Sequence, residues 1–390
     1  MPSAVIVDAV RTPLGRRNGK LKDWHPADLA AETLKALVER NNLDAGQIDD
    51  VIMGCVMQVG EQAANIGRNA MLIAGYPEEV PATTVDRQCG SSQQAAHFAA
   101  QGVIAGAYDM VVAAGVESMT RVPMGASMMS GPGVPFTAAM GARFADRGGM
   151  VPQGISAEMI ADKWNITRDE MDQIALASQL NAAKATDEGR FQNEIIPITY
   201  KTEDGKTEQM TIDEGFRPDS SIEKLSSLKP AFRPDGRVTA GNSSQITDGA
   251  SAMLIMSEEK ANQLGLKPRA RFHSFSVVGA DPILMLTGPI PATNKVLEKA
   301  KLKMDDIDLV EINEAFASVI VAWERELHPD MSKVNVNGGA IAIGHPLGCS
   351  GARLMTTLLN ELERTGGRYG LQTMCEGGGM ANATIIERLG

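Results

Sequence analysis

The sequence predicts an α/β protein made of two similar halves, with a long insertion in the first half. Strand-prone and helix-prone segments alternate through most of the 390 residues, which implies mostly parallel strands joined by helical crossovers. Short segments also recur about 260 residues further on, in the same order. The recurring pairs are Ile48–Val51 with Ile307–Val310, Cys89–Ser91 with Cys349–Gly351, and Tyr108–Gly115 with Tyr369–Glu376. Three ordered matches at nearly one offset indicate an internal repeat.

The insertion follows from a difference between the halves. After Met380 the second half continues directly into a strand-prone segment, Ala383–Glu387, whereas the matching segment of the first half, Ala252–Met256, comes long after Met119. The predicted domains are residues 1–119 with 248–269, residues 120–247 as the inserted loop domain, and residues 270–390.

Within the insertion, the sequence predicts a loop followed by two helices. Arg121–Gln153 is rich in glycine, proline and methionine, which is typical of irregular structure. Ser156 is expected to cap the first helix. Thr167 and Glu170 have the spacing of a capping box, and the helix that they start is expected to end near Gly189.

Composition and charge narrow the function. A net charge of −11 argues against nucleic-acid binding, which depends on Lys and Arg at phosphates, but leaves room for a small anion at a local basic patch. The four cysteines lack CxxC spacing, so neither a disulfide framework nor a metal site is expected. The N-terminus lacks a signal-peptide pattern, and no apolar run reaches the length of a membrane span. A cytoplasmic protein without membrane insertion is the expectation.

Cys89 lies where a predicted strand meets a predicted helix. Thr83–Asp86 is β-prone, and the helix-prone segment Ser92–Ala100 is expected to stop at Gly106. The positive end of a helix dipole favours a thiolate, and the small residues Gly90–Ser92 leave room for a substrate. A buried, unreactive cysteine is the alternative, because most intracellular cysteines are of that kind.

Three further motifs suit the same chemistry. His345 is fixed by its neighbours within the glycine-rich segment Gly338–Gly351, which suits a base or a hydrogen-bond donor; a turn histidine without a chemical role is the alternative. Cys375 precedes three glycines whose N–H groups can bind an oxyanion. Asn313 and Glu314 follow a predicted strand, the usual site position in α/β sheets. Together the four motifs predict one catalytic site.

These motifs resemble the thiolase family over essentially the whole chain. The matching segments are Val85–Ala95, Gly241–Gln245 with Asp248–Ala250, Asn313–Ala317, Gly338–Gly351 and Cys375–Met380. The resemblance implies the thiolase fold, with two pseudo-repeated mixed-sheet βα halves packed together in layers and an inserted loop domain. It implies a degradative 3-ketoacyl-CoA thiolase of fatty acid β-oxidation, which uses CoA to cleave 3-ketoacyl-CoA into acetyl-CoA and a shortened acyl-CoA.

The resemblance also implies a role for each site residue. Cys89 would carry the acyl group, and His345 would activate it and donate to a thioester oxygen. Cys375 would be the acid/base that moves the proton to or from CoA or the substrate α-carbon. Asn313 would hold a water in one oxyanion hole, while the N–H groups of Cys89 and Gly377 would form the other.

CoA is expected as a substrate, with no tightly bound cofactor. Residues 217–237 hold five basic against three acidic side chains in an otherwise acidic chain, although a solvated loop is the alternative. The resemblance implies that Arg217 and Ser244 contact CoA and that Phe316 lies near its pantetheine. A homo-oligomer, a tetramer or a dimer, is also expected, with part of the methionine-rich stretch 121–149 buried between subunits.

The acyl specificity depends on a few departures from the family pattern. In thiolases the acyl pocket lies beside the loop before Gly288–Pro291, where Met285 would line it. Pro152 and Gln153 stand where many thiolases have His and Met, and Asp86 stands where they usually have Asn. The loss of two wall side chains favours medium-length or bulky, even ring-bearing, acyl groups over acetoacetyl-CoA.

Three alternatives stay open on the sequence alone. One is an acetoacetyl-CoA thiolase that condenses two acetyl-CoA. Another is a ketoacyl-synthase-like condensing enzyme, although those enzymes typically have His in place of Cys375. The third is an inactive acyl-CoA or lipid carrier with a thiolase fold, which would be expected to lack Cys89 or Cys375, and both are present.

Overall fold

The computed structural model describes residues 3–129 and 133–390. Its main element is a ten-stranded mixed sheet with the order β10-β11-β12-β9-β1-β8-β5-β3-β4, in which β2 also pairs with β8. These strands are β1 Ala4–Arg11, β2 Gly15–Arg16, β3 Asp50–Gly54, β4 Ala82–Val85, β5 Met110–Ser118, β8 Thr247–Ser257, β9 Ala270–Gly279, β10 Leu309–Ile312, β11 Tyr369–Glu376 and β12 Met380–Arg388.

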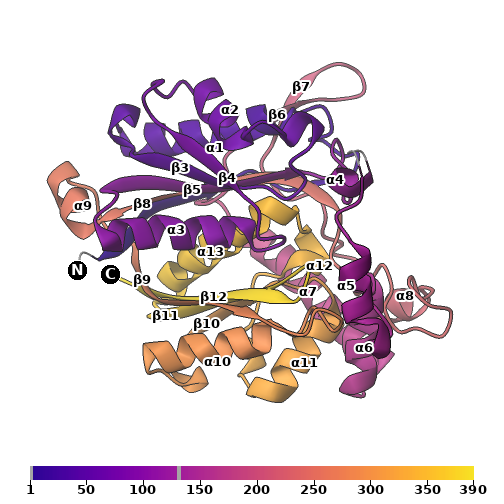
Figure 1. Cartoon of the computed structure of the whole chain (residues 1–390). Coiled ribbons are helices and arrows are strands. Elements are labelled where there is room, and N and C mark those ends of the chain that lie inside the picture. The colour runs from indigo at the N-terminus through magenta and orange to yellow at the C-terminus, as the bar shows by residue number, and fades with distance from the viewer. Residues whose placement is uncertain (1–2, 130–132) are drawn as a thin grey trace.

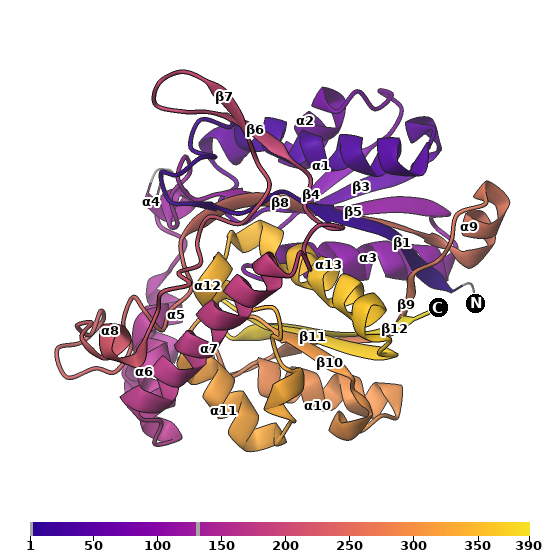
Figure 2. The ribbon, with the colours of Figure 1, turned by 180° about the vertical axis from the view of Figure 1, so that it is seen from behind.

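The sheet is divided in space into two layers that sandwich a pair of helices (Figure 1). β1 and β9 join the layers through only two residue pairs, Val5 with Arg271 and Ile6 with Ala270. α3 and α13 lie between the layers, α1 and α2 cover one outer face, and α10 and α11 cover the other (Figure 1, Figure 2). These helices are α1 Pro26–Asn41, α2 Ile66–Ile73, α3 Ser91–Ala105, α10 Pro289–Ala300, α11 Ala317–Leu327 and α13 Leu347–Thr365. The predicted layered α/β fold is confirmed.

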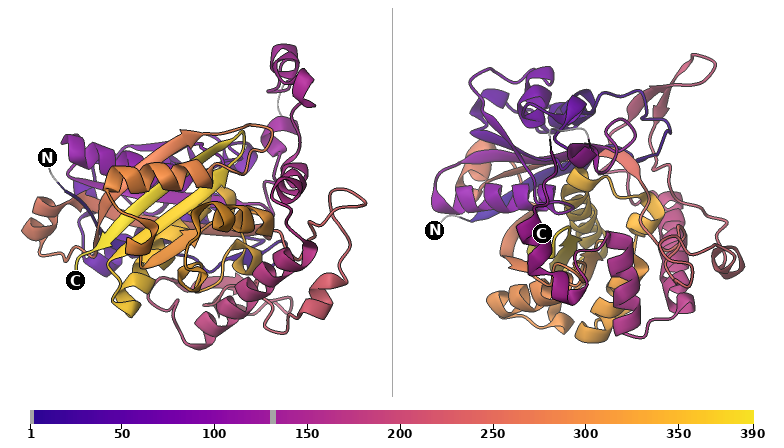
Figure 3. Two further views of the ribbon diagram at one scale, coloured as in Figure 1. Left: turned by 90° about the horizontal axis from the view of Figure 1, so that it is seen from below. Right: turned by 45° about the vertical axis from the view of Figure 1, so that its right-hand side comes forward.

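The remaining elements lie at one side or at the edges. α6 and α7 pack against α11, and α7 also packs against α12. The segment with α4 and α5 extends away from the layers (Figure 3). These elements are α4 Ala126–Met129, α5 Ala138–Arg143, α6 Gln153–Lys163, α7 Arg168–Asp187, α8 Ile222–Ser226, α9 Glu258–Leu264 and α12 Ala340–Ile343, and β6 Ile198–Lys201 pairs with β7 Thr207–Met210. The division into three domains stays a prediction.

Several local predictions are confirmed. α3 follows β4 after a short turn and ends at Gly106, which has the left-handed conformation that glycine favours. The capping box of Thr167 and Glu170 starts α7. In the part of the chain that the structure describes, no helix is both long and apolar enough to cross a membrane.

Three local predictions are wrong. Only β3–β4, β3–β5 and β10–β11 are parallel among the described pairs of the large sheet, because β8 returns antiparallel after the insertion and a tight turn joins β11 to β12. Ser156 does not cap α6, since that helix starts earlier, at Gln153, and the Ser156 hydroxyl donates instead to the Leu284 carbonyl at 2.7 Å. The expected loop at 121–153 contains the short helices α4 and α5.

Candidate active site

Cys89 lies in the turn between β4 and α3, two residues before the helix starts, and is 5% exposed. Burial, and after it the nearby Glu376 carboxyl, raise the pKa of its thiol to about 12. Hydrogen bonds from the N–H groups of Gly377 and of Cys89 itself act in the opposite direction. In the resting protein, desolvation thus acts against the thiolate that the helix dipole is expected to favour.

Cys375 is the second thiol of the site. It lies near the end of β11 and is fully buried. Burial raises its pKa well above that of an ordinary thiol, and the charge of Cys89 raises it again, which places the two sulfur atoms close together. Cys89, Cys375 and the N–H of Gly377 therefore lie near one another in the folded chain.

His345 lies between α12 and α13 and is 4% exposed. Its Nδ1 is 2.5 Å from the hydroxyl of Ser350, which itself donates to the Pro346 carbonyl at 2.9 Å. Because that hydroxyl proton is used, the hydroxyl accepts from Nδ1–H, and Nε2 keeps its lone pair. Burial, together with the positive charge of Arg353, lowers the pKa of His345 to about 3, so the imidazole is neutral near pH 7.

Asn313 completes this pair of side chains. It follows β10, is fully buried, and donates from Nδ2 to the Nε2 atom of His345 at 3.4 Å. Its Oδ1 atom has no hydrogen-bond partner within residues 3–129 and 133–390. A buried amide oxygen without a protein partner suits a bound water, which is the role that the sequence predicts for Asn313.

A cavity of about 560 Å³ opens beside these residues and contains the predicted CoA contacts. Arg217 and Ser244 both line it. Ser244 donates its N–H to the Ala315 carbonyl at 3.0 Å, which connects the cavity to the chain next to Phe316. Phe316 belongs to the same buried apolar cluster as Met285 and Cys375. Arg217 and Ser244 thus line the cavity, whereas Phe316 and Met285 pack in the apolar cluster that contains Cys375.

The basic segment 217–237 is largely neutralised. Arg233 pairs with Asp162 at 2.8 Å, Arg237 pairs with the same carboxylate, and Lys224 pairs with Asp219. The excess of basic residues in this segment is thus a poor guide to where an anion binds. Two other basic residues line the cavity, Arg16 and Arg17, and their only sequence signal is that they are adjacent.

Two further site residues were missed by the sequence-based reasoning. Ser350 fixes the orientation of His345 through a hydrogen bond. In the sequence, the sole sign of this contact is that the two residues are five positions apart. Glu376 lies against Gly90, where a Cβ would be 1.9 Å from its Oε1 atom, and both of its carboxylate oxygens are buried without partners in the described chain. Burial raises the pKa of Glu376 to about 9, so it is neutral near pH 7.

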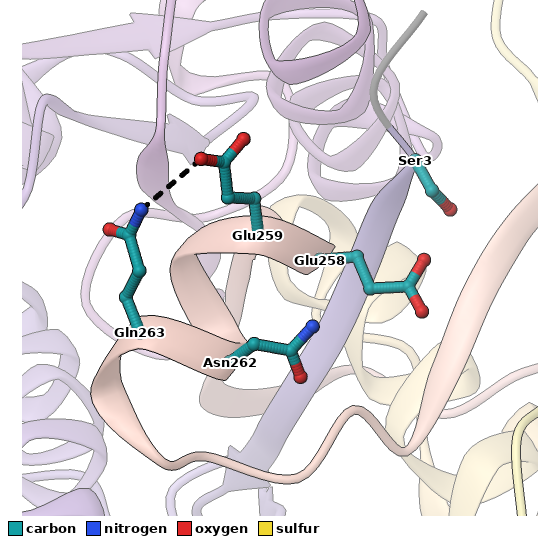
Figure 4. A pocket seen from close by; sticks show the side chains of 5 residues that line it. All are labelled: Ser3, Glu258, Glu259, Asn262 and Gln263. Atoms are coloured by element: carbon teal, nitrogen blue, oxygen red, sulfur yellow. Dashed lines mark hydrogen bonds between the residues drawn. The ribbon is translucent and has the colours of Figure 1, made fainter.

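A larger cavity, about 650 Å³, lies at α9 (Figure 4). It is lined by Ser3, Glu258, Glu259, Asn262 and Gln263. Gln263 donates to Glu259 at 3.3 Å, which is the hydrogen bond drawn in Figure 4. α9 is at the opposite end of the layers from α12 (Figure 1), so the size of this cavity does not make it the site of the chemistry. No cluster of three or more metal-ligating side chains occurs among the residues described.

Comparisons with known proteins agree with this fold. The model of the thiolase N-terminal domain matches residues 4–259, and that of the C-terminal domain matches residues 266–388. The chain is 52% identical to the steroid 3-ketoacyl-CoA thiolase FadA6 of Mycobacterium tuberculosis, over all of this chain and 95% of that protein. It is 48% identical to a 3-ketoacyl-CoA thiolase of Aliivibrio fischeri over the full length of both.

Two solved structures have the same fold along the chain. The acetyl-CoA acetyltransferase of Bacillus anthracis superposes with a TM-score of 0.90 at 40% identity, covering 100% of this chain and 99% of the other. Human mitochondrial 3-ketoacyl-CoA thiolase gives 0.90 at 39% identity with the same coverage. Fold and matches together define an acyltransferase. The chain belongs to the thiolase family.

Proposed function

We propose that this protein is a degradative 3-ketoacyl-CoA thiolase that passes the acyl group through Cys89. The observation that carries the proposal is the proximity of two buried thiols, Cys89 and Cys375, with the N–H of Gly377 beside Cys89. The neutral imidazole of His345 and the amide of Asn313 form the adjacent hydrogen-bonded pair. These are the groups that thiolytic cleavage of a C–C bond needs.

In the first half-reaction, the Cys89 sulfur attacks the C3 ketone and its proton passes to Nε2 of His345. The new oxyanion accepts from the N–H groups of Cys89 and Gly377. The C2–C3 bond then breaks, which leaves an acyl thioester on Cys89 and an acetyl-CoA enolate. Cys375 donates its proton to C2, and acetyl-CoA departs. Both thiols are neutral near pH 7, because burial raises their pKa values, so each begins with the proton that this step transfers.

In the second half-reaction, a new CoA transfers its thiol proton to the Cys375 thiolate. The CoA sulfur attacks the acyl-Cys89 carbonyl, and the Cys89 sulfur leaves and takes back the proton held by His345. The enolate of the first half-reaction would be stabilised at its thioester oxygen by His345 and by Asn313, through a water on its unpartnered Oδ1. The cycle returns every group to its starting protonation state.

The anionic part of CoA is assigned to the cavity of about 560 Å³. Arg217, Arg16 and Arg17 bring three guanidinium groups to its wall, which suits the phosphates of CoA. Ser244 and Phe316 would follow the pantetheine inward. Met285 is packed in the apolar cluster with Cys375, which supports its proposed place in the acyl pocket.

The protein is proposed to be a homo-oligomer in a reducing, cytoplasmic compartment. β4 is the last strand of the sheet path and carries half-buried side chains, and the neighbouring helices expose Leu72, Ile73 and Phe98. The segment with α4 and α5 exposes further apolar side chains, Met129 at 76% and Phe136 at 57%. All four cysteines are unpaired, which suits a reducing environment. A dimer or tetramer would cover these apolar side chains.

Turnover with a panel of 3-ketoacyl-CoA esters tests the proposed substrate class. The expected result is a higher kcat/KM for medium-length, bulky or ring-bearing acyl groups than for acetoacetyl-CoA, by ~10-fold or more. The relative named a steroid 3-ketoacyl-CoA thiolase supports the bulky range. If acetoacetyl-CoA is the best substrate between C4 and C16, the short-chain acetoacetyl-CoA thiolase is the better assignment.

A further inference from the structure

The segment that carries His345 is held by two buried carboxylates that the proposed reaction does not use. α12 ends just before His345 and α13 starts just after it. Glu314 follows β10 and is 3% exposed, and Glu117 lies in β5 and is fully buried. Each carboxylate contacts the first turn of one of these two helices, so the histidine lies between two fixed points.

Glu117 holds the start of α13. Its Oε2 accepts from the N–H of Gly348 at 2.9 Å and from the N–H of Val56 at 2.9 Å. Its Oε1 accepts from the N–H of Met57 at 3.0 Å and from the side-chain amide of Gln62 at 2.6 Å. Gly348 comes from the C-terminal half and the other three donors come from the N-terminal half. The carboxylate therefore ties α13 to the opposite half of the protein.

Glu314 holds the start of α12 in the same way. Its Oε2 accepts from the N–H of Ile341 at 3.1 Å and from the hydroxyl of Ser178 at 2.6 Å. That hydroxyl also accepts from the N–H of Gly339 at 3.1 Å. Its Oε1 accepts from the side chain of Asn335 at 3.0 Å. The segment that precedes His345 is thus fixed directly and through one serine.

These contacts exclude a direct chemical role for either carboxylate. Every partner donates: Glu117 accepts from four N–H groups of the protein and, at 3.9 Å, from the thiol of Cys55. Burial raises the pKa of both groups, while the hydrogen bonds oppose this rise. We propose that Glu117 and Glu314 are positioning residues that clamp residues 339–348 at both ends and so fix His345 against Asn313. The proposal rests on the proposed function, which gives His345 its catalytic role.

The backbone around the clamp leaves little room for adjustment. A Cβ at Gly348 would be 2.7 Å from the Cα of Cys55 and from the Val116 carbonyl oxygen. A Cβ at Gly339 would be 2.3 Å from the carboxyl carbon of Glu314. When one carboxylate loses an accepting oxygen, the helix start has to shift, and a shift of ~1 Å at a catalytic group can slow a reaction ~100-fold.

The test compares Glu117→Gln and Glu314→Gln with a matched control. In either variant the new NH2 group faces N–H or O–H donors and cannot accept from them. The clamp therefore weakens, while the volume of the side chain stays nearly constant. The measurements are the pre-steady-state rate of Cys89 acylation by acetyl-CoA, the KM for CoA and the melting temperature. We expect acylation to slow by roughly 10- to 100-fold while KM changes by less than about threefold.

Glu194→Gln is the control for buried-carboxylate loss. Glu194 is 1% exposed and accepts from Arg11 at 2.6 Å and from Thr357 at 3.0 Å, and it does not contact residues 339–348. This variant should lower the melting temperature and leave the acylation rate of the folded protein within about twofold. Ser178→Ala removes only the hydroxyl bridge to Gly339, and it should slow acylation about threefold if Glu314→Gln does not fold.

The outcomes separate this proposal from the proposed function. Wild-type acylation rates in both Glu→Gln variants, or in Ser178→Ala where those do not fold, would overturn the clamp. Equal slowing in Glu194→Gln would also overturn it, because a general loss of packing would then be the cause. If His345→Ala acylates at the wild-type rate, the proposed function fails instead; slow acylation in His345→Ala with normal Glu variants refutes the clamp alone.

Discussion

Cys89 and Cys349 occupy equivalent places in the two halves, yet their surroundings differ. Each stands at the start of one of the two helices between the sheet layers, α3 and α13 (Figure 1). These helices contact each other at matching positions, since Ser92 accepts from the N–H of Ala352 at 2.8 Å. Cys89 precedes its helix, whereas Cys349 lies within the first turn and donates to Ser251 at 3.4 Å.

The difference shows that the pKa of a thiol does not identify the nucleophile in this protein. Burial raises the pKa of Cys89 to about 12 and that of Cys349 to about 11. What distinguishes Cys89 is the direction of its hydrogen bonds, because its sulfur accepts from Gly377 N–H while the sulfur of Cys349 is used as a donor. Relative to its cysteine, α13 starts about one turn earlier than α3, and this difference in the helix start separates the proposed nucleophile from its counterpart.

The largest effect is expected from the two equivalent cysteines themselves. Cys89→Ala should lower kcat by roughly 10⁴-fold or more, because the covalent route is lost. Cys349→Ala should change kcat by less than about threefold and lower the stability by about 1–2 kcal/mol, through a small cavity. Steady-state kinetics and thermal melts check both. Comparable losses of kcat in the two variants would show that Cys89 and Cys349 do not differ in their roles.

Cys375→Ala sharpens the contrast between the two thiols of the site. This variant keeps Cys89, so acetyl-CoA should still acylate it, but the proton donor for the enolate is absent. We expect kcat to fall by roughly 10³-fold, within the range of general acid–base losses, while acyl-enzyme accumulates. Quenched-flow mass measurements give the acylated fraction. If this variant fails to acylate, Cys375 rather than His345 would be the group that activates Cys89.

Ser350→Ala tests how the hydrogen bond at Nδ1 orients His345. The loss of that partner should free the imidazole to rotate or change tautomer, and kcat should fall by about 10-fold with little change in KM. Ser251→Ala is the matched control, because its hydroxyl contacts Cys349 rather than the site. The account would be contradicted by equal kinetic effects in the two serine variants.

The smallest expected effect concerns stability in acid. Burial lowers the pKa of His345 to about 3, whereas the unfolded value is about 6.5. Between these values only the unfolded chain binds the proton, so the stability contribution is complete above pH 6.5 and is lost as the pH falls toward 3. At pH 5 the loss is about 2 kcal/mol.

His345→Asn should therefore lose about 2 kcal/mol less than the wild type between pH 7 and pH 5. The exposed His328 provides the control, and His328→Asn should behave as the wild type does. Its left-handed backbone, with φ of 49°, accommodates asparagine. Urea titrations at the two pH values give the difference, and an unchanged pH dependence in His345→Asn would mean that the folded protein protonates this ring.

Much of the fold was predictable because its signals are local or repeated. The recurrence of segments such as Ile48–Val51 gave the two halves, and the capping box of Thr167 fixed the start of α7 to the residue. Strand direction was not predictable, because the alternation of strands and helices does not say whether β8 returns parallel or antiparallel. The start of α6 was missed because Pro152 caps it without a side-chain hydrogen bond.

For the site, the proposed reactive groups have signals in the sequence, and the groups that orient them have none. Cys89, His345 and Cys375 each stand in a short motif with an unusual backbone. By contrast, Glu117 acts on a helix more than two hundred residues away, and Arg16 reaches the cavity of Arg217 only in the folded chain. Burial also acts against the expected effect of the helix dipole on Cys89, which a linear sequence cannot express.

Mapping of the acyl group tests the central claim most directly. Wild-type protein is mixed with acetyl-CoA in the absence of free CoA, quenched in acid and digested, and the peptides of all four cysteines are weighed. The account predicts the acetyl mass on the peptide that contains Cys89, with none on those of Cys375 and Cys349. An acetyl group that maps to Cys375 or Cys349, with Cys89 unmodified, would contradict it.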